Sequence, residues 1–119
     1  MEITISRWRL EPRTSADVRI LTFLFTTDAP EVPEQIAKIV LSGSLMTELG
    51  DYLNEQYETE AFVLQLAKLA AALLKRELEI NPEAIYNPDL KFGYITDNFP
   101  FGGVEIPDID TLQNWKFTI

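Results

Sequence analysis

The sequence predicts a single α+β domain over residues 1–119, and three observations predict it. Two strand-like segments stand at the start of the chain, a long apolar helical pattern occupies residues 59–79, and two short strand patterns follow Pro82. A chain of 119 residues has the size of one domain, and no repeat or long linker divides it. We expect the strands to form one mainly antiparallel sheet, with the long helix packed across it.

The first two strands are predicted over residues 2–10 and 17–27, joined by a turn into an antiparallel hairpin. Ile3 and Ile5 share one parity, whereas the later apolar residues of the same segment share the other. The apolar side must therefore change faces between Ile5 and Trp8, which requires a bulge or a bend. The second segment is apolar with little alternation, which is typical of a strand covered on both faces.

A helical region is predicted to begin at Pro33, because proline suits the first position of a helix. Ile36, Ile39 and Val40 follow at helical spacing. Ser42-Gly43-Ser44 then interrupts the pattern, and a serine there can cap a following helix. This second helix is expected from Leu45 to about Gln56.

The third helix is predicted over residues 59–79, between a capping threonine at Thr59 and a stop at Asn81-Pro82. Its polar stripe is narrow, and apolar side chains occupy most of the remaining circumference. Such a helix must be buried on more than one side. It either lies at the centre of the domain, which we favour, or turns part of its surface to a second subunit.

Two short strands are predicted near the end of the chain, over residues 91–96 and 115–119, as a carboxy-terminal pair. In the last strand, Trp115, Phe117 and Ile119 share one face, with lysine and threonine on the other. We expect this strand to be tied into the sheet or to pair with a neighbouring molecule.

The chain contains neither histidine nor cysteine. It therefore lacks the usual general base, the commonest metal ligand, the thiolate nucleophile and any disulfide. We predict a protein that is not an enzyme, binds no cofactor and resides in the cytoplasm. The longest apolar stretch, residues 61–74, is interrupted by Gln65 and Lys68 and is too short for a membrane span, and no signal peptide precedes it.

The net charge of −9 is concentrated in one part of the sequence. Residues 28–60 contain eight acidic residues and only one basic residue, Lys38. Direct binding to nucleic acid requires neutralisation of phosphates, so an acidic chain is poorly suited to it. A basic protein surface is the better electrostatic match.

Two sets of residues are predicted to contact a partner. Phe99 and Phe101 stand beside two glycines in a predicted loop, where exposed aromatic rings would anchor an interface; alternatively, the rings fold back as a lid on the core. The second set is an acidic surface for a basic partner, or else only the solvated side of the second helix: Glu48, Asp51, Glu55 and Glu58.

Four arginines fall on the first two predicted strands and the turn between them: Arg7, Arg9, Arg13 and Arg19. They can form a site for an anion or an acidic partner. The alternative, which we favour, is that they lie on solvated strand faces and pair with neighbouring acids.

Asp108 and Asp110 offer carboxylate oxygens of the kind that calcium and magnesium bind. The rest of the calcium-loop pattern is absent, because Leu112, Gln113 and Asn114 follow in place of further ligands and a glycine. Turn and cap chemistry beside Pro107 is the favoured interpretation.

These observations favour a non-catalytic protein that binds another protein, with a homo-oligomer as one form of this function. The first alternative is an acidic inhibitor or nucleic-acid mimic that binds a basic partner. The second alternative is a metal-dependent hydrolase that uses Asp108 and Asp110.

Overall fold

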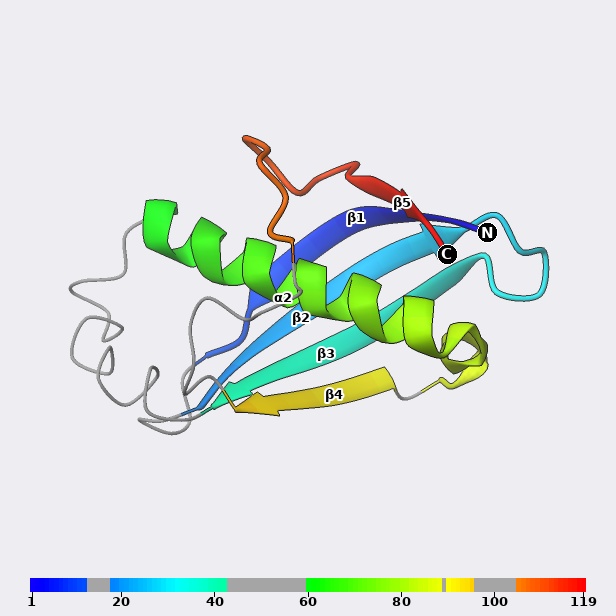
Figure 1. Cartoon of the computed structure of the whole chain (residues 1–119), viewed down its shortest axis with the longest axis horizontal. Helices are drawn as coiled ribbons and strands as arrows, with labels where there is room; N and C mark the ends of the chain where they lie inside the picture. Colours follow the sequence, from blue (N-terminus) through cyan, green and yellow to red (C-terminus); the bar gives the residue numbers. More distant parts are fainter. Residues whose placement is uncertain (13–17, 43–59, 89, 96–104) are drawn as a thin grey trace.

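In the described part of the chain, five strands form one sheet in the order β4-β3-β2-β1-β5, and the long helix α2 lies across one of its faces (Figure 1). This computed structural model describes residues 1–12, 18–42, 60–88, 90–95 and 105–119. It confirms an α+β architecture. The elements are β1 (Glu2–Leu10), β2 (Val18–Thr27), β3 (Glu34–Ser42), α2 (Glu60–Ile80), the 3-10 helix η1 (Pro82–Tyr86), β4 (Leu90–Ile95) and β5 (Lys116–Thr118).

Strands β1 and β2 pair in antiparallel fashion, as predicted, although the connection between them lies outside the described residues. Ile5 is opposite Phe25, but Arg7 is opposite Leu24, so one extra residue of β1 is accommodated between these two pairs. This bulge lies where the change of parity in the sequence required it. Its consequence is that Ile5 and Trp8 face the same side of the sheet.

The predicted helix after Pro33 is wrong, because residues 34–42 form strand β3. Ile36, Ile39 and Val40 fit helical spacing, but the burial of this segment alternates with a period of two. Ala37, Ile39 and Leu41 are fully buried, whereas the residues between them are half-buried or exposed. Three β-branched residues in this segment also favour the strand, and pairing along the whole of β2 overrides the weak helical signal.

The two strands near the end of the chain do not form a pair. Strand β4 lies at one edge of the sheet, parallel to β3, and β5 lies at the other edge, antiparallel to β1. The helix connects β3 with β4, because parallel neighbours need a long crossover. The sheet is nonetheless mainly antiparallel, since three of its four described pairings are of that kind.

Strand β5 is tied to β1 beyond its three assigned residues. The Ile5 amide donates to the Trp115 carbonyl at 2.9 Å, and the Asn114 amide donates to the Ile5 carbonyl at 2.8 Å. Asn114 has a φ of 68°, a left-handed conformation that asparagine tolerates better than most residues. The Phe117 side chain is buried and its ring lies 5.1 Å from that of Trp115, so the predicted apolar face of this strand is confirmed.

Helix α2 is the centre of the hydrophobic core. Every residue from Leu66 to Leu74 is buried, so this stretch is covered around its whole circumference within one chain. Lys68 is the charged residue within this stretch, and it is buried as well, with 8 % of its surface exposed. Toward its end the helix becomes amphipathic, and Lys75 and Glu79 form an exposed ion pair at 3.6 Å. Among the described residues, no helix has both the length and the apolar character needed to cross a bilayer.

The 3-10 helix η1 is fixed to the start of β3 by one side chain. The Gln35 amide donates to the carbonyl of Ile85 at 2.9 Å and to that of Asn87 at 2.7 Å. These bonds hold the segment that leads from α2 into β4. The start of β4 is thereby positioned beside β3, with Leu90 opposite Ala37.

Candidate functional site: the outer face of the sheet

The face of the sheet opposite α2, which we call the outer face, is the main candidate site (Figure 1). The strand registers set its side chains in rows that cross the strands, about 6.6 Å apart along each strand. We name three rows after their residue in β3. The Ile36 row holds Arg7, Leu24 and Ile36; the Lys38 row holds Arg9, Thr22, Lys38 and Lys91; the Val40 row holds Ile20, Val40 and Gly93.

Two of these rows are apolar at their centre. Ile36 is 51 % exposed although β3 is an interior strand, and its partner Leu24 is half-buried. Ile20 and Val40 are also half-buried. The prediction that β2 is covered on both faces is therefore wrong for the described residues, because only the side of β2 that faces α2 is fully buried. Apolar side chains are thus gathered in the middle of an open sheet face, which makes this face the candidate site.

Basic side chains surround the apolar rows. In the described part of the chain, the outer face carries five of the ten basic residues of the sequence and only three acidic ones. The excess is positive, whereas the net charge of the protein is −9. The basic residues are Arg7, Arg9, Lys38, Lys91 and Lys116; the acidic residues are Glu2, Glu11 and Glu34.

One carboxylate is already bound on this face. Both carboxylate oxygens of Glu11 accept hydrogen bonds from the Arg9 guanidinium, at 2.9 and 3.0 Å. The Thr22 hydroxyl donates to the same carboxylate at 2.6 Å. These bonds, first that from Thr22 and then that from Arg9, lower the pKa of Glu11, and the positive charge of Lys38 adds to the effect. Glu11 therefore remains ionised under mildly acidic conditions.

Of the other cations on this face, Lys116 forms an exposed ion pair with Glu2 at 3.9 Å. Within the described ranges, neither Arg7 nor Lys91 forms an ion pair. Lys38 and Lys91 stand directly opposite each other on neighbouring strands, an arrangement of like charges that destabilises a sheet. The Lys38 row thus contains three cations and has Glu11 as its nearby carboxylate.

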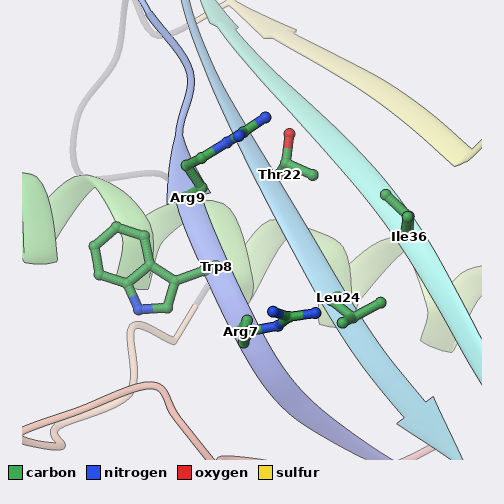
Figure 2. Close-up of a pocket in the computed structure, with 6 residues that line it drawn as sticks. All are labelled: Arg7, Trp8, Arg9, Thr22, Leu24 and Ile36. Atoms are coloured by element: carbon green, nitrogen blue, oxygen red, sulfur yellow. The ribbon is translucent and has the colours of Figure 1, made fainter.

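Two neighbouring hollows share the side chain of Ile36. The first is lined by Arg7, Trp8, Arg9, Thr22, Leu24 and Ile36. Figure 2 shows Arg7 extended toward Leu24 and Arg9 extended toward Thr22, while the Trp8 ring lies on the other side of β1. The second hollow lies toward β4 and is lined by Ile36, Lys38, Pro88, Leu90 and Lys91. Side chains of a partner can thus sit on both sides of Ile36.

The four arginines of the first two predicted strands do not form one site, so the less favoured interpretation, a shared anion site, is wrong for the described residues. Arg7 and Arg9 lie together on the outer face, because the bulge in β1 turns both toward it. Arg19 is on the other side of the sheet, opposite Leu41, and is only 4 % exposed. Arg13 lies outside the described residues. The favoured alternative, pairing with a neighbouring acid, is confirmed for Arg9 through Glu11.

The residues predicted to contact a partner lie outside the described residues: Phe99, Phe101, Glu48, Asp51, Glu55 and Glu58. The predicted helix from Leu45 to Gln56 and its cap at Ser44 lie outside them as well. Asp108 and Asp110 are described, and both are exposed. In the described segments, no three acidic residues gather where they could hold a metal ion. A metal at this pair of aspartates stays the alternative that the sequence disfavours.

The residues that sequence reasoning missed are Lys38, Lys91, Leu24 and Ile36. They come from three strands that are far apart in the sequence, and the assignment of residues 34–42 as a helix removed one of these strands. The alternation of Ala37, Ile39 and Leu41 is the signal that could have revealed it.

No protein-family model matches the chain, and neither a curated protein nor a solved structure matches it. The function must therefore be inferred from the site itself.

Proposed function

We propose that the protein is a non-catalytic binding protein that holds a protein partner on the outer face of its sheet. The observation that carries this proposal is the exposure of Ile36, in an interior strand, beside Leu24 and between two hollows. An apolar cluster that a partner covers, ringed by polar and basic side chains, is the usual anatomy of a protein interface. The absence of histidine and cysteine supports binding rather than catalysis.

The core supports the same choice of surface. The wide apolar pattern of residues 59–79 by itself allows that a second subunit covers the helix. Because Leu66 to Leu74 are buried within one chain, this stretch has no free apolar side to offer. A partner that needs an apolar contact must therefore use another surface, and the outer face offers one with the exposed Ile36 beside the half-buried Leu24. A homo-oligomer, like a location in the cytoplasm, remains a prediction.

The proposal is tested with variants of the outer face in a quantitative pull-down from the native host. Ile36→Asp places a charge at the centre of the face, and Ile80→Asp is the matched control because Ile80 is 69 % exposed at the end of α2. We expect a protein captured by the wild type to be lost with Ile36→Asp and retained with Ile80→Asp. Equal capture by all three proteins, or no specific capture by any, would overturn the proposal.

A milder variant separates loss of binding from loss of folding. Ile36→Thr keeps a β-branched side chain that favours a strand. Its thermal unfolding is expected to match that of the wild type, while its capture of the partner is reduced. Multi-angle light scattering on the same samples shows whether the partner is a second copy of the chain.

A further inference from the structure

We infer that the partner of the outer face is an acidic protein segment, which presents a carboxylate between two apolar side chains along an extended stretch. This inference rests on the proposed function, because it names the chemistry of the partner that the same face binds. It follows from the pattern of charges and apolar side chains on the three rows.

Strand β3 displays an apolar, a basic and an apolar residue in succession toward the outer face: Ile36, Lys38 and Val40. Neighbouring positions in this series are about 6.6 Å apart. Side chains on one side of an extended partner segment have the same spacing, since they also come from every second residue. A segment with the complementary order, apolar, acidic and apolar, therefore matches the strand position by position.

The central carboxylate of such a segment would meet the Lys38 row. Lys38 and Lys91 are directly opposite each other and, with Ile36, line one hollow. A negative charge placed there relieves the repulsion between the two ammonium groups and gains attraction from both. The same carboxylate is also within reach of the long side chain of Arg7, which extends from the adjacent row and lines the neighbouring hollow.

The protein already shows how a carboxylate is held on this face. Glu11 is bound by a guanidinium and by a hydroxyl, with both of its oxygens accepting hydrogen bonds from Arg9. Arg7 extends from the same side of β1 and lies in the adjacent row (Figure 2). A guanidinium in this position is suited to bind a partner's carboxylate in the same two-point manner.

Two other classes of partner fit less well. A nucleic acid carries a phosphate at every nucleotide, and these phosphates would gain nothing from the apolar Ile36 and Val40 rows. A second copy that used the same face in a symmetric dimer would place Lys38 and Lys91 of one chain against the basic residues of the other. Both remain possible outcomes of the experiment.

The direct test is an NMR titration with a synthetic peptide as long as β3, which has 9 residues. Every second residue of this peptide is valine or glutamate, in alternation, and the residues between them are threonine. We expect saturable shifts of the amides on the outer face at peptide concentrations below about 1 mM. A peptide of the same composition in scrambled order and one with lysine in place of glutamate are the controls, and neither should bind.

Three variants define which charges bind the peptide. Arg7→Gln should weaken binding about fivefold to tenfold, because a charge-assisted hydrogen bond is lost. The matched control, Arg76→Gln, removes an exposed arginine from α2 and should leave binding unchanged. Glu11→Gln should strengthen binding about twofold to fivefold, since it frees Arg9 for the peptide. Binding of the wild type should also weaken from about 0.1 M to about 1 M salt, where screening becomes strong.

The outcomes separate this inference from the proposed function. If Ile36→Asp abolishes partner capture but the alternating peptide does not bind, or if Arg7→Gln has no effect, the inference is wrong and the binding face stands. If an oligonucleotide binds this face in place of the peptide, or if the peptide is displaced by self-association of the protein, the acidic segment is likewise excluded. If Ile36→Asp leaves partner capture in the pull-down unchanged, the proposed function itself is wrong, and the inference about the partner is wrong with it.

Discussion

The two faces of the central strands carry similar apolar residues, but these residues are buried on one face and partly exposed on the other. Along β2, Leu21, Phe23 and Phe25 are 0 % exposed under helix α2, whereas Leu24, between two of them, is only half-buried on the outer face. Both faces are thus apolar, but only one is covered within the described residues. The comparison teaches that apolar composition alone does not distinguish a core from an interface. The charged side chains that surround the apolar residues make the distinction. The outer face has them in Arg7 and Lys38.

The largest expected effect comes from truncating one leucine on each face. Leu21→Ala should lower the free energy of unfolding by about 2–5 kcal/mol, because it opens a cavity in a packed core. Leu24→Ala should cost no more than about 1 kcal/mol, since its side chain already contacts water. Urea unfolding of the two variants measures this difference. Equal losses would mean that the outer face is as much a part of the core as the inner one.

A smaller effect is expected on the side of the sheet that α2 covers. The Tyr94 hydroxyl donates to the Leu73 carbonyl at 3.5 Å, and burial, together with the nearby carboxylate of Glu77, raises the pKa of this phenol. Tyr94→Phe should therefore cost about 0.5–1.5 kcal/mol at neutral pH.

The pH dependence of the same variant has a definite sign. The neutral phenol is favoured in the folded state, so its contribution is fully present below the ordinary pKa of 10.0 and is lost as the pH rises above that value. Wild-type stability should fall more steeply above pH 10.0 than that of Tyr94→Phe. Denaturant unfolding at several alkaline pH values tests this, and parallel curves for the two proteins would refute the assignment.

The smallest effect concerns the facing lysines of the outer face. Lys91→Glu replaces a like-charge pair with Lys38 by an opposite-charge pair, and should stabilise the free protein by about 0.2–1 kcal/mol at low salt. The same change should weaken binding of the alternating peptide, because it introduces a carboxylate at the position where the carboxylate of the peptide must bind. Thermal unfolding at low and high salt checks the first expectation. Destabilisation by Lys91→Glu at low salt would show that the two lysines do not repel each other.

Much of the fold could be predicted from local patterns. The change of parity in residues 2–10 located the bulge, and the apolar periodicity of residues 59–79 located the long helix to within one residue at either end. Each of these two signals lies within one segment of the chain. Each can be read without knowing what that segment packs against, which is why these two predictions are confirmed.

The remainder depends on contacts between distant segments. The spacing of Ile36, Ile39 and Val40 is compatible with a helix, and their branched side chains are compatible with a strand. Only the pairing of β3 with β2 decides between the two. Strand β4 was assigned to the wrong neighbour because a parallel partner across a helix leaves no local signal. The rows of the outer face join Arg7, Lys38 and Lys91 from three separate strands, so they became visible only with the registers.

Methyl NMR of the wild-type protein during titration with the alternating peptide tests the central claim most directly. Leu21 and Leu24 report on the two faces of one strand, and Ile39 and Ile36 report on the two faces of the next. Binding at the outer face should shift the methyl resonances of Leu24 and Ile36 and leave those of Leu21 and Ile39 nearly unchanged. Shifts confined to Leu21 and Ile39, or to helix α2, would contradict it.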